Sequence, residues 1–190
     1  LSGSFAAGTM HVVTGPSGSG KTTLLHLLAG LELADSGYVE VTGHDLAQAD
    51  RAARATIRRA AIAYVAQDGG LVPHLSAIEN VELALAIRGR KHEPGDALRV
   101  LDSVGLAERA TQRVERLSHG ERARVAIARA IAARPALLLA DEPTARLDVA
   151  NAVSVAALLS RLARETGTAV VCATHDPLVI RQADVELRLG

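Results

Sequence analysis

Aromatic residues are nearly absent from this chain of 190 residues. They make up 2% of the sequence and include no tryptophan, so the hydrophobic core must be built from Ala, Leu, Val and Ile. An excess of either charge is also lacking, because 21 Lys and Arg balance 21 Asp and Glu. A chain without net positive charge has no electrostatic footprint for non-specific nucleic-acid binding, although a local patch is compatible with this balance. We therefore expect no nucleic-acid partner.

Cysteine and long apolar runs are equally scarce. Cys172 is the only cysteine, which excludes an internal disulfide and favours a reducing compartment. It lies in the apolar run 169–173, where a small buried residue is the expected role. No apolar stretch reaches the roughly 20 residues that span a bilayer, and no signal peptide is visible. Any membrane role is therefore expected to come through a partner.

One glycine-rich stretch organises the rest of the chain. Residues 15–22 fit the phosphate-loop pattern G-x-x-x-x-G-K-[ST] without substitution. Glycines let consecutive backbone N–H groups turn toward one anion, while Lys21 supplies charge for the β and γ phosphates and Thr22 a hydroxyl for Mg²⁺. The stretch lies between a β-rich run, 10–14, and a helix, 23–30, a context that a chance glycine-rich turn would rarely have. The predicted nucleotide contacts here are Gly15, Pro16, Ser17, Gly18, Ser19, Gly20, Lys21, Thr22 and Thr23.

Strands and helices alternate along most of the chain, which predicts an α/β fold with a mostly parallel sheet covered by helices on both faces. The helical stretch 75–105 interrupts this alternation. We therefore expect a single domain with a core of 1–70 and 135–190 and an inserted helical subdomain of about 71–134. Residues 1–8 are interpreted as the end of a strand and a turn. The face of helix 50–59 formed by Arg51, Arg54 and Arg58 is expected to be solvated. The other strands are expected at 38–42, 61–65, 136–140, 169–173 and 185–189, and the other long helices at 118–134 and 149–165.

Two acidic residues, Asp141 and Glu142, follow the apolar run 136–140. Ligands bind at the carboxyl ends of strands in open α/β sheets, so both carboxylates are expected at the nucleotide. Asp141 would then coordinate Mg²⁺ together with Thr22, and Glu142 would act as general base on an attacking water. The alternative is an acidic turn before Pro143.

A second helix start has the features of an anion site. Ser118 and Glu121 have the S-x-x-E spacing of a capping box, which alone predicts no more than a helix start. Gly120 in the first turn, however, is costly for a helix unless the backbone must be approached closely. A capped N-terminus with an accessible hydroxyl can also bind phosphate.

The order of these motifs resembles the ATP-binding subunit of ABC transporters over the whole chain. Gly15–Thr22 matches the Walker A motif, Gln67 the Q-loop, and Leu117–Glu121 the signature. The run 71–81 is similar to lipoprotein-releasing, macrolide-exporting and cell-division ATPases. The remaining matches are Leu137–Glu142 with Walker B, Ala145–Asp148 with the D-loop and His175 with the switch histidine.

The resemblance implies a P-loop NTPase with a RecA-like sheet, a small antiparallel β subdomain and an inserted α-helical subdomain. It implies ATP and Mg²⁺ as ligands, a permease partner, and a location on the cytoplasmic face of the inner or plasma membrane. Two ATPase domains would close head to tail, so that Ser118, Gly120 and Asp148 serve the partner's nucleotide. Gln67 would contact Mg²⁺ or the attacking water, and His175 would steady the γ-phosphate. The other histidines considered are assigned structural or surface roles: His11, His26, His44, His74 and His92.

Two departures from the family pattern stand out. His119 replaces the usual glycine and Glu121 the common glutamine of the signature, and contact with the γ-phosphate is still expected through Ser118 and Gly120. The family also stacks adenine on an aromatic residue well upstream of the phosphate loop. Phe5, the only candidate, is too close in sequence, so we expect the chain to be trimmed at both ends.

Two other functions use the same phosphate loop. A soluble ABC-type ATPase acting on nucleic acid or ribosomes usually has coiled-coil insertions, zinc-binding cysteines or tandem domains, which this chain lacks. A small-molecule kinase has no need of Glu142 beside Leu117–Glu121. The sequence therefore favours an ATPase subunit of a transporter, with the transported substrate left open.

Overall fold

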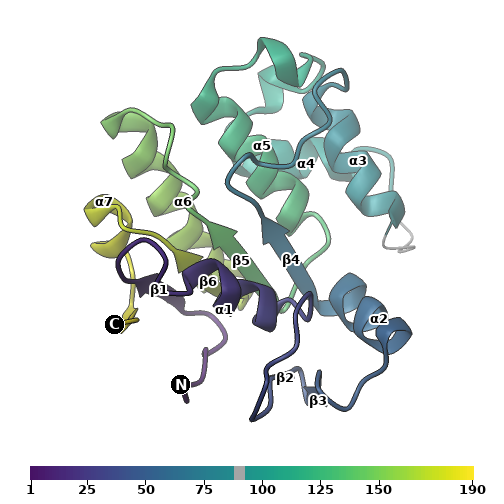
Figure 1. Cartoon of the computed structure of the whole chain (residues 1–190). Coiled ribbons are helices and arrows are strands. Elements are labelled where there is room, and N and C mark those ends of the chain that lie inside the picture. Colours follow the sequence, from purple (N-terminus) through teal and green to yellow (C-terminus); the bar gives the residue numbers. More distant parts are fainter. Residues whose placement is uncertain (88–92) are drawn as a thin grey trace.

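The fold is built on a single parallel sheet. A computed structural model describes residues 1–87 and 93–190, so the expectation for His92 lies outside the described residues. The sheet has the strand order β4-β5-β6-β1-β7, and its strands β4, β5, β6 and β1 are labelled in Figure 1. Its strands are β1 (Met10–Thr14), β4 (Ile62–Val65), β5 (Leu137–Asp141), β6 (Ala169–Ala173) and β7 (Val185–Arg188).

The register brings the functional loops to one edge. Every pairing in this sheet is parallel, and Val12 of β1 lies between Cys172 of β6 and Glu186 of β7. The carboxyl ends of parallel strands lie at the same edge. The loops that leave β1, β4, β5 and β6 therefore share this edge, which confirms the predicted α/β fold.

Helices cover both faces of the sheet. One face packs against α5 (His119–Ile131) and α6 (Val149–Thr166), and Cys172, fully buried, belongs to this core. The other face packs against α1 (Lys21–Leu28) and includes Val13, Leu139 and Val171. The strands β1, β5 and β6 are buried at every position. The apolar runs of β5 and β6 are typical of strands in a parallel sheet that is covered on both faces.

A small hairpin replaces the expected strand 38–42. Only Glu40–Val41 is extended, as β2, and it pairs antiparallel with β3 (His44–Asp45). The shortening has a local cause: Thr42 and Gly43 both have positive φ, 51° and 80°, as a tight two-residue turn requires. The hairpin is the small antiparallel element of the fold.

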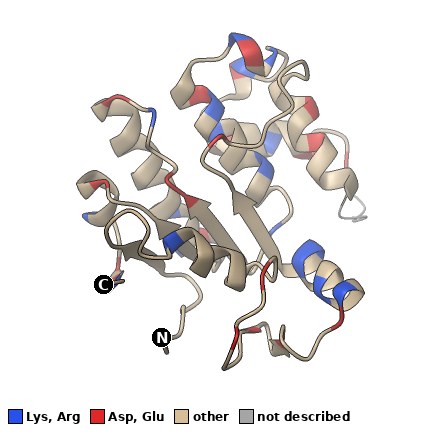
Figure 2. Cartoon of the chain, viewed as in Figure 1, with Lys and Arg blue, Asp and Glu red and all other residues tan. Residues whose placement is uncertain are grey.

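Two other expectations hold only in part. The turn expected within residues 1–8 forms at 7–8, but residues 1–6 form no strand: Phe5 packs edge-on against the His11 ring and the Ala6 amide donates to His11 Nε2 at 3.0 Å. In α2 (Arg51–Ala61) the arginine face, blue in Figure 2, is only partly solvated. Arg54 donates to the Ala49 carbonyl, and Arg58 donates to the Gly30 carbonyl at 2.8 Å, just past the end of α1.

Helices α3 (Ala77–Ile87) and α4 (Asp96–Ser103) pack with α5 beside the sheet (Figure 1). Helix α3 begins at a capping box, in which the Ser76 amide donates to Glu79 and the Glu79 amide donates back to Ser76. Helix α5 ends at Ile131 rather than at Arg134, which adopts φ 48° before Pro135. The division into a core of 1–70 and 135–190 and a subdomain of about 71–134 stays a prediction. A short helix, α7 (Pro177–Ile180), precedes β7.

Candidate nucleotide site

The phosphate loop joins β1 to α1. Its glycines Gly18 and Gly20 have φ of 81° and 89°, a left-handed conformation that side chains disfavour. Gly20 is the N-cap of α1 and has no side chain to satisfy the first amides, and the first turn, Lys-Thr-Thr, contains no acidic residue. The N-caps of α5, α6 and α7, in contrast, are Ser118, Asp148 and Asp176, and their side chains accept hydrogen bonds from backbone amides of the first turn. The start of α1 is thus left open to an external anion.

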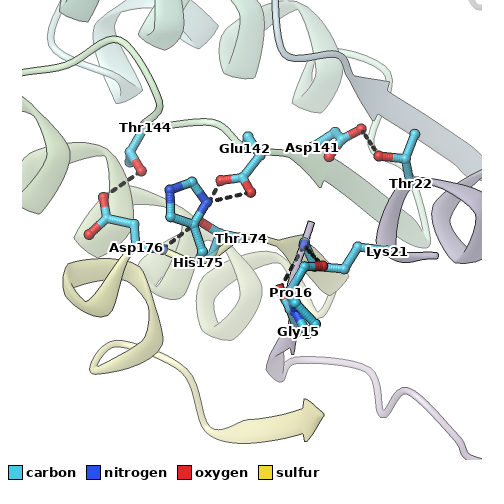
Figure 3. A network of polar contacts seen from close by, with 10 residues as sticks. All are labelled: Gly15, Pro16, Lys21, Thr22, Asp141, Glu142, Thr144, Thr174, His175 and Asp176. Carbon is cyan, nitrogen blue, oxygen red and sulfur yellow. Dashed lines mark hydrogen bonds and ion pairs between the residues drawn. The ribbon is translucent and has the colours of Figure 1, made fainter. Parts of the chain in front are cut away.

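The interior of the loop contains an unsatisfied hydroxyl. Ser19 Oγ is buried and has no hydrogen-bond partner among the described residues. A Cβ on Gly15 would lie 2.5 Å from this oxygen and 2.7 Å from the Leu189 carbonyl, so only glycine fits there. Lys21 Nζ donates to the carbonyls of Gly15 and Pro16 at 2.8 and 3.1 Å, which holds its charge over the loop (Figure 3). These features fit a bound phosphate chain.

The next part of the site is a pair of oxygen ligands from separate elements. Thr22 Oγ1 of α1 donates to Asp141 Oδ2 at the end of β5, at 2.9 Å. Mg²⁺ prefers such oxygen donors and takes one or two carboxylates together with water and phosphate oxygens. The donor set therefore fits Mg²⁺. Tyr64 of β4 also donates to Asp141 Oδ2, at 3.4 Å, and burial together with this carboxylate raises the pKa of Tyr64 to about 12.

Glu142 points away from Asp141, although the two are adjacent in sequence (Figure 3). Its φ is 46°, a strained value for a residue other than glycine that costs on the order of 1–3 kcal/mol. The conformation directs its carboxylate to the loop after β6. There Glu142 Oε2 accepts from Thr174 Oγ1 at 2.9 Å, and Oε1 lies 2.8 Å from His175 Nδ1. The Glu142 side chain is 15% exposed and the His175 side chain 76%.

Sequence reasoning missed the residues that support this pair. Thr174 is fully buried, and its hydroxyl accepts from the Asp176 amide at 3.0 Å while donating to Glu142. Asp176 Oδ2 accepts from Thr144 Oγ1 at 2.6 Å, which joins the loops that follow β5 and β6. The position of Thr174–Asp176 directly after a buried strand was the signal that could have found them.

Gln67, at the end of β4, is exposed and lines a cleft of about 110 Å³. The cleft is also lined by Glu142 and by His119, in the first turn of α5. Two of the predicted catalytic residues, Gln67 and Glu142, are thus brought to one cleft with the signature helix.

The start of α5 has the predicted capping box: the Glu121 amide donates to Ser118 Oγ at 3.2 Å and the Ser118 amide to Glu121 Oε2 at 2.8 Å. The hydrogen bond from the Ser118 amide is the main cause that lowers the carboxyl pKa of Glu121.

Ser118 is exposed, whereas Gly120 is buried. A Cβ on Gly120 would lie 2.3 Å from Asn151 Oδ1 of α6, so the glycine makes room for a side chain of the same molecule. Asn151 in turn donates from its backbone amide and from Nδ2 to the Asp148 carboxylate, both at 2.8 Å.

Known proteins resemble this chain, with its parallel sheet, phosphate loop and two adjacent carboxylates, in sequence and in fold. Residues 1–145 match the family described as ABC transporter. The chain belongs to this family. As an ABC ATPase it binds and hydrolyses ATP.

Curated relatives of this ABC ATPase include the lipoprotein-releasing system ATP-binding proteins LolD of Bordetella pertussis and Bordetella parapertussis. Each is 43% identical over 188 residues, covering 98% of this chain and 81% of the relative. Among solved structures, the ATP-binding cassette MJ0796 as a dimer with ADP and Pi has a TM-score of 0.87 at 36% identity, covering 98% of this chain and 83% of that one. A second dimeric structure of MJ0796, a bacterial ABC transporter cassette, has a TM-score of 0.84 at 36% identity, covering 98% and 84%. Within residues 1–87 and 93–190, no helix of this ABC ATPase has the length and apolar character needed to cross a membrane.

Proposed function

We propose that this ABC ATPase powers a membrane transporter, and that two such domains close head to tail over ATP. The observation that carries the proposal is that one chain has an open phosphate loop at the start of α1 and a second predicted phosphate contact, Ser118, exposed at the start of α5. The start of α1 is surrounded by Lys21, Thr22 and Asp141. The start of α5 exposes Ser118 and His119. A partner's ATP explains the second start, and the dimeric structures of MJ0796 support this arrangement.

Binding is assigned to the first half of the site. The loop amides and Lys21 would hold the phosphates, with Ser19 Oγ available inside the loop. Thr22 and Asp141 would hold Mg²⁺, which neutralises charge on the β and γ phosphates when bound. Tyr64 would keep the Asp141 carboxylate turned toward α1.

Water activation is assigned to Glu142. Thr174 anchors one carboxylate oxygen of Glu142 and His175 meets the other. Because the His175 ring is largely exposed while Glu142 is not, His175 can turn toward a γ-phosphate and release Oε1 to accept a proton from water. Gln67, which shares a cleft with Glu142, would contact Mg²⁺ or orient that water. Ser118, Gly120 and Asp148 would act across the dimer on the partner's nucleotide.

Coupling to transport is assigned to a permease partner or a fused membrane domain. The similarity to lipoprotein-releasing relatives supports a place on the cytoplasmic face of the inner or plasma membrane. The substrate would be selected by that partner.

The test is the substitution Glu142→Gln, which keeps the shape of the side chain but removes the base. We expect ATP binding to be kept and hydrolysis to fall by at least about 100-fold. The variant should elute as a dimer in ATP on size-exclusion chromatography, because hydrolysis no longer reopens it. Lys21→Ala is the matched control and should weaken ATP binding itself. Hydrolysis by Glu142→Gln at the wild-type rate, or a monomer in saturating ATP, contradicts the proposal. Copurification with ribosomes or nucleic acid, and with no integral membrane subunit, contradicts its transport part.

A further inference from the structure

One arginine of α5 binds the loop that follows Gln67. Arg129 donates through Nη1 to the Gly70 carbonyl and through Nη2 to the Gly69 carbonyl, the second at 3.0 Å. The two terminal nitrogens of a planar guanidinium bind the two carbonyls separately in a fixed geometry, a fork that the single nitrogen of a lysine ammonium does not reproduce. Arg129 thus joins α5, the signature helix that begins after Ser118, to the turn that directly follows Gln67.

The loop has a conformation that suits this fork. The Gly69 amide donates to the Ala66 carbonyl at 2.8 Å, and the Gly70 amide donates to Asp68 Oδ1 at 2.9 Å. Gly69 and Gly70 have φ of 76° and 56°, which other residues adopt only with strain. A Cβ on Gly69 would lie 3.5 Å from the Ala126 side chain, so the turn packs directly on α5.

Burial makes the contact necessary for the arginine. Desolvation lowers the pKa of Arg129, and the charge of Asp68 opposes this shift. A partly buried guanidinium without its acceptors costs more than an exposed one. Breaking the fork is therefore unfavourable for both sides, and the turn is held to α5.

The loop is also anchored beyond the turn. Asn80 of α3, fully buried, accepts from the Val72 amide at 2.9 Å and donates to the Val72 carbonyl at 3.1 Å. Gln67 therefore precedes a segment held by two side chains, one from α5 and one from α3.

We propose that Arg129 is a positioning residue for Gln67, because it holds the turn directly after Gln67 to α5, the helix that begins with the signature residues. Gln67, His119 of that helix and Glu142 line the same cleft. The inference rests on the proposed function for its catalytic consequence, but not for the contact itself.

The first test does not depend on activity. In Arg129→Lys, hydrogen exchange at the Gly69 and Gly70 amides should rise by roughly tenfold or more, because one charged hydrogen bond is lost. The matched control is Arg161→Lys, since Arg161 of α6 also donates to a carbonyl, that of Ser103 at 2.8 Å, far from this loop. Unchanged exchange in Arg129→Lys overturns the proposal, whether or not the chain powers transport.

The second test is a double-mutant cycle on ATP hydrolysis. Arg129→Lys should lower kcat roughly tenfold with KM for ATP unchanged within about twofold. In a Gln67→Ala background it should have no further effect, because its action passes through Gln67. Equal losses in both backgrounds overturn the positioning role. If Arg129→Lys does not fold, Gly70→Ala replaces it, since its Cβ would lie 3.2 Å from Arg129 Nη2, with the same expectations. If the wild-type protein does not hydrolyse ATP, the proposed function is contradicted, and the positioning role of Arg129 is then decided by the hydrogen-exchange test alone.

Discussion

Gly120→Ala tests why the signature motif of this chain contains a glycine. The new Cβ would lie 2.3 Å from Asn151 Oδ1 and 2.6 Å from its Cγ, so Asn151 must turn away and lose its Nδ2 bond to Asp148. Overpacking costs about 1–3 kcal/mol, and the added loss of the Nδ2 hydrogen bond places this substitution in the upper part of that range, at about 2–3 kcal/mol. The higher helix propensity of alanine than of glycine offsets up to about 1 kcal/mol of this cost. We expect a net loss of about 1–2 kcal/mol in the free energy of unfolding, or a melting temperature about 2–8 °C lower for a chain of this size.

The second substitution, Asn151→Ala, separates two explanations. By itself it should cost about 1 kcal/mol or less, because the Asn151 amide still donates to Asp148. In Gly120→Ala/Asn151→Ala the new methyl group has room, so thermal unfolding should return to that of Asn151→Ala. ATPase activity recovered along with stability would assign the glycine to packing within the chain. Stability recovered without activity would assign it to the partner's nucleotide. A Gly120→Ala variant with an unchanged melting temperature refutes the packing argument.

Two further predictions concern pH and metal dependence. Burial lowers the pKa of His11 below 6.5. Its contribution to stability is therefore complete above that value and is lost as the pH falls toward the folded-state pKa. Urea unfolding at pH 7.5 and 5.5 should show this loss, and His11→Gln should reduce the difference; an equal difference in both proteins contradicts it. Thr22→Val removes a hydroxyl that donates to Asp141, so the Mg²⁺ concentration for half-maximal ATPase activity should rise roughly tenfold or more. Thr56→Val, on the exposed surface of α2, is the control, and an unchanged Mg²⁺ requirement in Thr22→Val argues against a ligand role.

Local patterns were sufficient for much of the fold. The runs 136–140 and 169–173 are apolar throughout, and they form β5 and β6, which are buried at every position; only Ala136, which is exposed, lies outside its strand. The capping box at Ser118 forms as its spacing predicts. The failures occurred where local pattern and tertiary contact differ. Residues 1–6 form no strand, and Phe5 and Ala6 instead contact His11.

The sequence by itself determined which chemistry is present. A phosphate loop, two adjacent carboxylates and a capped glycine-containing helix start need particular residue types at short spacing, and such patterns can be read without a fold. Only the tertiary structure decided which partners these residues have. The left-handed backbone of Glu142 turns its carboxylate to Thr174 and His175 while Asp141 meets Thr22. Gly120 faces Asn151, and Arg129 binds the turn after Gln67. These contacts join residues far apart in the chain, and their geometry follows from strand register and helix packing.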